Sequence, residues 1–146
     1  MDTNDAPKAR LAEHLHELDP FSAALHRDAA PLLGHAMLDL LEEAGLGPED
    51  IDAVGGVGPL ALAISTGILH AAASRGQYLD AFSIEGGAIA GPTIVGRRVV
   101  VVDYWDAQGA AERAKMEGAD VRDMAVVVGE SGLRLYAPSD VAREAQ

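Results

Sequence analysis

The spacing of hydrophobic residues predicts helices in the first third of the chain. Three leucines, at positions 11, 15 and 18, share one helix face, and Asp19-Pro20 follows as a pair that ends helices. From Ala29 to Ala44 a second apolar stripe recurs at helical spacing. We therefore expect an N-terminal helical extension over residues 1–20 and then a longer helix.

After residue 50 the pattern changes to short apolar runs that alternate with helical segments. The predicted strands are Ile51–Val57, Tyr78–Ile84, Arg98–Asp103, Val121–Val128 and Leu133–Ala137. Helices are expected over Leu60–Ser74 and from Ala110 to Gly118, whereas Glu85–Gly96 is a glycine-rich connection. This alternation predicts an α/β fold, with a central, mostly parallel sheet of about five strands flanked by helices. The length suits a single domain over residues 1–146.

The most informative stretch is the run of four valines from Val99 to Val102. Such a run is typical of a central parallel strand that is buried on both faces. Asp103 ends the run, Asp106 follows, and Gly109 and Ala110 open the next helix. Open α/β sheets bind ligands at this edge, and a helix start binds phosphate. We therefore expect a phosphate-sugar site at these four residues, with Asp103 as the candidate Mg²⁺ ligand.

A second candidate site is the sequence GGVGP, which begins at Gly55 and follows a predicted strand. Glycine lets a backbone approach an anion closely, so Gly55, Gly56 and Gly58 are candidate pyrophosphate contacts. The stretch from Gly56 to Ala61 also fits the dinucleotide fingerprint G-x-G-x-x-A, with Asp80 downstream as the candidate ribose ligand. A third interpretation is a tight turn that binds nothing, and the residues leave all three open.

The composition excludes several classes of partner. A net charge of −12 repels nucleic acid and anionic membranes. The chain has no cysteine, so thiolate metal sites are excluded, and its five histidines lack the spacing of a metal motif. No apolar stretch is long enough to span a membrane, and the polar N-terminus is unlike a signal peptide. We therefore expect a soluble, cytoplasmic protein.

Three segments resemble the type I phosphoribosyltransferases, and within them the orotate phosphoribosyltransferases of actinobacteria. The segments are IDAVGGVGPLALAISTGILHAAASRGQYLDAFSIEGG, GRRVVVVDYWDAQGAA and GADVRDMAVVV, and the similarity extends from about Leu18 to Val141. The resemblance implies the Rossmann-like fold of that family and a homodimer. It also implies Mg²⁺-dependent transfer of phosphoribose from phosphoribosyl pyrophosphate to orotate.

The residues that this family uses for its chemistry are only partly present. The resemblance implies two adjacent acids at the strand end; Asp103 is the first, and Tyr104 replaces the second. Ala107 and Gln108 replace the hydroxyl residues that hold phosphate. No Lys or Arg occurs over residues 76–96, where the resemblance implies a mobile basic loop. Phosphoribosyl transfer needs a metal on the polyanion and cations on the departing pyrophosphate.

We therefore expect an orotate phosphoribosyltransferase-like protein that is catalytically inactive, uses no cofactor, and has a binding or regulatory role. The expected partners are a second copy of the chain and a small nucleotide or phosphate ligand. Trp105, the only tryptophan, is expected to fill part of the phosphate pocket. Two alternatives remain: an active, Mg²⁺-using transferase rearranged around Asp103 and the Gly55–Gly58 loop, and a nucleotide-binding module that uses Gly56, Gly58 and Ala61.

Overall fold

The computed structural model describes residues 6–142. The helices are α1 (Ala6–Leu15), α2 (Pro20–Leu25), α3 (Ala29–Glu43), α4 (Gly58–Ser74), α5 (Gln108–Met116) and the short 3-10 helix η2 (Pro138–Asp140). The strands are β1 (Ala53–Val57), β2 (Asp80–Glu85), β3 (Ala88–Ala90), β4 (Arg98–Asp103), β5 (Asp120–Val128) and β6 (Leu133–Tyr136). They form one sheet in the order β3-β2-β1-β4-β5-β6, and every neighbouring pair except β2–β3 is parallel. The predicted α/β fold with a mostly parallel sheet is confirmed.

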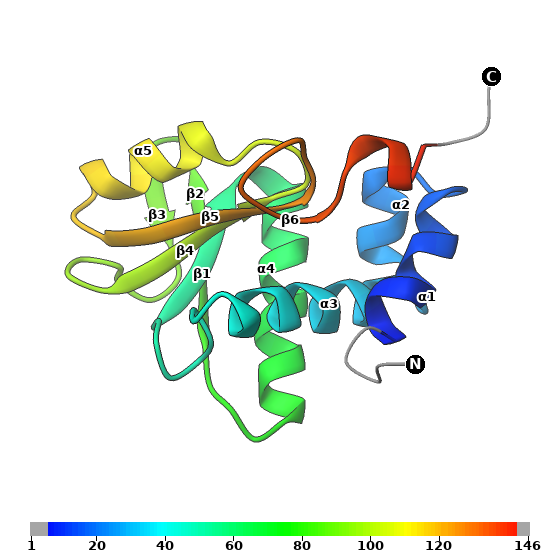
Figure 1. Ribbon diagram of the computed structural model, residues 1–146. Helices are drawn as coiled ribbons and strands as arrows, with labels where there is room; N and C mark the ends of the chain where they lie inside the picture. Colours follow the sequence, from blue (N-terminus) through cyan, green and yellow to red (C-terminus); the bar gives the residue numbers. More distant parts are fainter. Residues whose placement is uncertain (1–5, 143–146) are drawn as a thin grey trace.

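The sheet lies between two helical layers (Figure 1). α5 covers one face, α3 and α4 cover the other, and α1 and α2 pack beside α3. The crossover from β1 to β2 therefore runs through α4 on one face, and the crossover from β4 to β5 runs through α5 on the opposite face. This arrangement creates a topological switch point between the neighbouring strands β1 and β4, where open α/β sheets bind ligands.

β4 is the centre of the hydrophobic core. Val99 and Val101 pack on the side of α5, and Val100 and Val102 pack on the side of α3 and α4; all four are fully buried. Because side chains alternate along a strand, a run of valines supplies apolar groups to both layers at once. The prediction that this run is a central strand buried on both faces is confirmed.

The pair Asp19-Pro20 begins a helix and does not end one, contrary to the prediction. α1 already stops at Leu15, and Pro20 is the first residue of α2. The Asp19 carboxylate accepts a 2.8 Å hydrogen bond from the backbone N–H of Ser22 and so caps α2. Proline fits the first position of a helix because its missing N–H has no partner there.

The predicted connection Glu85–Gly96 contains a strand that the sequence pattern does not reveal. β3 pairs antiparallel with β2 across a two-residue turn, so the sheet has six strands, one more than expected. Both turn residues have positive φ angles, 56° at Gly86 and 84° at Gly87. Glycine adopts this conformation without steric cost, as tight hairpin turns require.

The first helix is joined to the core and to the last strand. Leu11 and Leu15 of α1 are buried in the same cluster as α3 and α4. The Tyr136 hydroxyl of β6 donates a 2.5 Å hydrogen bond to the Lys8 carbonyl oxygen. Within residues 6–142, no helix has the length and apolar character needed to cross a bilayer.

Candidate functional site

The candidate site lies where the parallel strands end. β1, β2, β4 and β5 finish at Val57, Glu85, Asp103 and Val128, and their parallel pairing brings these ends to one edge of the sheet. The switch point between β1 and β4 therefore places the start of α4 beside the loop that follows Asp103. Both predicted glycine- and aspartate-containing segments meet there.

The Asp103 and Asp106 carboxylates each accept a hydrogen bond from a nearby backbone N–H group with one oxygen. Asp103 Oδ1 accepts a 2.7 Å hydrogen bond from the N–H of Tyr104, and Asp106 Oδ1 accepts a 3.0 Å bond from the N–H of Gln108. Burial raises the pKa of Asp103, and the Asp106 carboxylate raises it further, whereas the Tyr104 N–H opposes the shift. Asp103 is thus a half-buried acid, and Asp106 sits at the start of α5.

Tyr104 points away from the site and into the core. Only 4% of the residue is exposed, and it packs in the cluster that includes Val100 and Val102. Strand alternation explains this direction: residues 100, 102 and 104 share one face, whereas Asp103 belongs to the other. This signal is present in the sequence, and the prediction overlooked it.

Trp105 lies at the rim of a hollow. The hollow measures about 240 Å³ and is bordered by Trp105, Asp106, Gln108 and the loop from Gly129 to Gly132, among others. Trp105 is 61% exposed, and its ring meets the Tyr104 ring edge-on at 4.9 Å. Trp105 therefore does not fill the pocket, contrary to the prediction. The buried aromatic residue here is Tyr104, which fills space in the hydrophobic core.

Gly55 and Gly56 are packing residues inside β1, whereas the prediction put them in a ligand loop. A Cβ on Gly55 would lie 2.4 Å from the Phe82 carbonyl oxygen, and a Cβ on Gly56 would lie 2.4 Å from the Val102 carbonyl oxygen and 2.8 Å from the Ala61 Cβ. Real Cβ atoms do not approach other atoms so closely. These two glycines therefore let β1 fit between its neighbours and against α4.

Of the three glycines, Gly58 is the one that lies outside β1. It has a φ angle of 89°, open space around it, and begins α4 directly after β1. Asp80 stands at the first residue of β2, at the opposite edge of the sheet, where it faces Arg97 at 3.8 Å. The dinucleotide fingerprint requires the acid at the carboxyl ends of the strands, beside the glycines. Asp80 lies at the other end of β2, so the structure does not bring the acid and the glycines together.

The start of α5 keeps space for a ligand. The helix begins at Gln108, two residues earlier than predicted, and nothing lies within 4 Å of a Cβ placed on Gly109. Ala110 is buried against the sheet together with Ala111 and Ala114, so it is a packing residue. Backbone N–H groups at a helix start favour an anion, and Gly109 is the predicted residue best placed to expose them.

Arg113 is a cation near the β2–β3 turn that the prediction missed. Its guanidinium donates to the Gly87 carbonyl oxygen and pairs with the Glu117 carboxylate at 3.1 Å. On the same strand pair, Ser83 donates a 2.5 Å hydrogen bond to Glu85. Arg113 belongs to α5 and lies outside residues 76–96, so the sequence of that segment gives no sign of it.

The acids of this edge do not form a magnesium site of their own. Across residues 6–142, no three His, Cys, Asp or Glu side chains gather closely enough to hold a metal ion. Asp103 has one oxygen occupied by the Tyr104 N–H, and the neighbouring position holds a buried phenol ring. Mg²⁺ is usually held by one or two carboxylates together with substrate phosphates and water, so Asp103 stays a predicted ligand for a metal that arrives with a phosphate-containing substrate.

Curated relatives identify the kind of protein to which this chain is similar. No family model matches the chain. The orotate phosphoribosyltransferase of Streptomyces avermitilis is 38% identical over 117 residues, which cover 71% of this chain and 62% of that protein. The enzyme of the same name from Tropheryma whipplei (strain Twist) is 38% identical over 120 residues, which cover 73% of this chain and 54% of that protein. The chain thus spans less than two thirds of the length of these relatives.

Solved structures extend the similarity to the fold. The orotate phosphoribosyltransferase of Mycobacterium tuberculosis H37Rv, in complex with 5-phospho-alpha-D-ribosyl 1-diphosphate, matches with a TM-score of 0.80 and 26% identity. That match covers 92% of this chain and 91% of the other. A phosphoribosyltransferase from Corynebacterium diphtheriae matches with a TM-score of 0.80 and 25% identity, over 93% of this chain and 98% of the other.

Proposed function

Since the chain is an orotate phosphoribosyltransferase-like protein with the type I phosphoribosyltransferase fold, we propose that it lacks transferase activity and has a binding or regulatory role. Its ligand in this proposal is a small molecule that carries a phosphate group, bound at the start of α5. No resident cofactor takes part.

The observation that carries the proposal is the burial of Tyr104. The resemblance implies a second acid at this position, next to Asp103. In its place stands a side chain that is 4% exposed and belongs to the core. The position therefore offers no metal ligand or proton acceptor toward the carboxyl edge of the sheet.

Local charge also supports the loss of catalysis. Asp103, Asp106 and Glu85 lie at or just after the strand ends, and Arg113 is already engaged with Gly87 and Glu117. Two like charges about 4 Å apart repel by about 4 kcal/mol at an effective dielectric constant of 20. A departing pyrophosphate would meet this repulsion without the cations that stabilise its charge. A single phosphate at the Gly109 amide carries less charge and would be tolerated better.

A steady-state assay tests the loss of activity. The purified chain is mixed with orotate, phosphoribosyl pyrophosphate and Mg²⁺, and consumption of orotate is followed by ultraviolet absorbance. The Streptomyces avermitilis relative serves as the positive control. We expect no turnover above the protein-free rate; turnover of about 1 s⁻¹, the low end of ordinary enzymes, would establish the alternative of an active, rearranged transferase.

Calorimetric titration with ribose 5-phosphate tests the binding role. We expect binding to the unmodified chain and its loss in Gly109→Glu, because the new carboxylate would stand at the phosphate position. Ala73→Glu, at an exposed position near the end of α4, is the control with the same change of charge. Absence of binding, or equal weakening by both substitutions, would contradict the proposed phosphate site.

The homodimer that the resemblance implies stays a prediction. Sedimentation equilibrium over a range of protein concentrations measures it directly. A single species of 15.2 kDa, the mass of one chain, at all concentrations would contradict it.

A further inference from the structure

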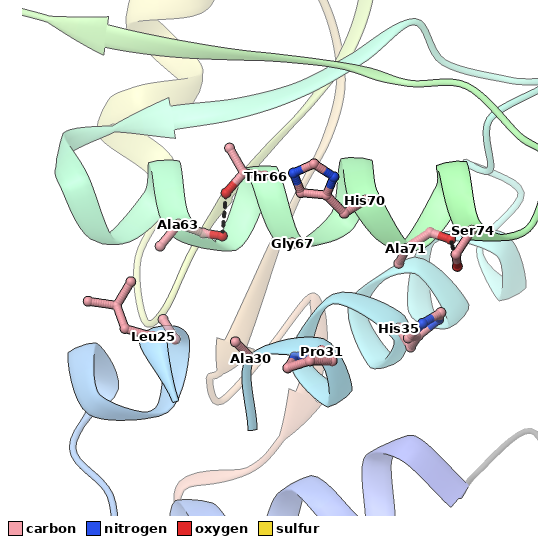
Figure 2. A pocket seen from close by; sticks show the side chains of 11 residues that line it. Leu25, Ala30, Pro31, His35, Ala63, Thr66, Gly67, His70, Ala71 and Ser74 are labelled. Carbon is pink, nitrogen blue, oxygen red and sulfur yellow. Dashed lines mark hydrogen bonds between the residues drawn. The ribbon is translucent and has the colours of Figure 1, made fainter. Parts of the chain in front are cut away.

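A groove between α2, α3 and α4 is separate from the carboxyl-edge site (Figure 2). Its volume is about 430 Å³, within the range of small-molecule sites. Its lining includes Leu25, Pro31, His35, Thr66, Gly67 and Ser74. Close contact of α3 and α4 forms its floor: a Cβ on Gly34 would lie 2.3 Å from the Gly67 carbonyl oxygen.

One end of the groove carries a histidine whose tautomer is fixed. Arg75 Nη2 lies 3.0 Å from His35 Nδ1. A guanidinium has only donors, so Nδ1 accepts this bond and the ring proton is on Nε2. Arg75 is held in turn by Asp39 at 2.9 Å and Glu42 at 3.0 Å. His35 therefore presents a neutral N–H donor, and Figure 2 shows its ring on α3 near the Ser74 end of α4.

The hydroxyl groups of the groove are arranged as acceptors. Thr66 donates its hydroxyl proton to the Ala63 carbonyl oxygen at 3.0 Å, and Ser74 donates to the Ala71 carbonyl oxygen at 2.7 Å (Figure 2). With the protons so used, the oxygen lone pairs are available to a donor from outside. The groove thus combines a fixed donor at His35 with acceptors on α4, between apolar walls.

The charges around the groove favour an uncharged ligand. α4 contains no Asp, Glu, Lys or Arg in its 17 residues. At the end of the groove, Asp39 and Glu42 outweigh the single positive charge of Arg75, so an anion would be repelled there. Burial and the Arg75 charge also lower the pKa of His35, against the Asp39 carboxylate, which raises it.

We propose that this groove binds a small uncharged molecule with an apolar body and an amide edge. Its carbonyl oxygen accepts from His35 Nε2–H, its N–H group donates to a hydroxyl oxygen of α4, and its apolar body lies against Leu25, Pro31 and Gly67. Recognition of a polar edge by fixed partners on an apolar surface is the usual design of small-molecule sites.

Titration of the ¹⁵N-labelled full chain with benzamide, followed by amide chemical shifts, tests this inference. We expect saturable shifts that centre on Gly67 and Ala71, and about tenfold weaker binding of benzoate, which has the same shape and a negative charge. His35→Phe keeps a ring but removes the donor, and we expect about fivefold weaker benzamide binding. Thr66→Val, which keeps the shape of the side chain, tests the acceptor in the same way.

Ala63→Leu fills the groove, and Ala73→Leu makes the same change at an exposed position of α4 outside the lining. Benzamide binding should be lost in the first and unchanged in the second, with far-UV circular dichroism verifying that both fold. Absence of shifts, equal binding of benzoate, or equal effects of the two leucine substitutions would overturn the inference. A dimer that Ala63→Leu dissociates would overturn it too, because a second copy would then cover the groove.

Discussion

Replacing Tyr104 by the acid that the family resemblance implies is expected to destabilise the protein strongly and not to repair the site. Tyr104 is 4% exposed in a cluster with Val100 and Val102. Truncation of a buried aromatic side chain typically costs about 3–5 kcal/mol, and the new carboxylate adds the cost of burying a charge. Domains of this size are stable by about 5–15 kcal/mol, so Tyr104→Asp removes a large part of the total.

Urea denaturation followed by far-UV circular dichroism measures this loss. Fluorescence is unsuitable because Trp105 contacts the substituted ring. Tyr104→Phe keeps the ring and should cost about 1 kcal/mol or less. Trp105→Asp places the same acid at the exposed neighbouring position and should also cost about 1 kcal/mol or less.

The destabilisation by Tyr104→Asp should depend on pH. Burial raises the pKa of the introduced carboxyl in the folded state, so the folded state binds its proton more tightly than the unfolded state does. The free energy of unfolding of the variant, relative to that of the unmodified chain, should therefore fall as the pH rises from about 4 to 7. A variant as stable as Trp105→Asp at neutral pH would refute the assignment of Tyr104 to the core.

Two further predictions concern residues away from Tyr104. Gly56→Ala should lower the free energy of unfolding by about 1–3 kcal/mol, because the new Cβ would meet the Val102 carbonyl oxygen. Gly109→Ala, the control, should leave the free energy of unfolding unchanged or raise it by up to about 1 kcal/mol. Equal urea midpoints of the two variants would contradict the packing role of Gly56. Hydrogen bonds from the Arg98 side chain and backbone N–H lower the pKa of Asp52 to about 2. The stability that Asp52 contributes is therefore present above the pKa that Asp52 has in the unfolded chain, and it is lost as the pH falls toward about 2. Urea midpoints of Asp52→Asn and the unmodified chain should therefore differ at pH 7 and converge near pH 2, and a gap that persists there would contradict this linkage.

Most of the fold could be predicted because its signals are local. The valine run of β4 and the helical stripe of α3 each fix their own element, and the structure confirms the first to the residue. β3 escaped prediction because it has only three residues and depends on the turn at Gly86 and Gly87. Asp19 was assigned to a helix end because the same residue types occur in helix caps and in turns, and only the hydrogen bond to Ser22 distinguishes them.

The candidate site was harder to predict because the sequence motif gives only the order of its residues along the chain. The role of each residue depends on the face of the sheet toward which its side chain points. Asp103 and Tyr104 are neighbours in sequence, yet alternation sends one side chain toward the α5 face and the other into the core under α3 and α4. A second acid at position 104 would need a change of the β4 backbone that turns this side chain outward. In this protein, position 104 therefore contributes to core packing instead of supplying the second acid that the resemblance implies. Restoring the family motif requires rebuilding the end of β4, beyond the exchange of a single residue.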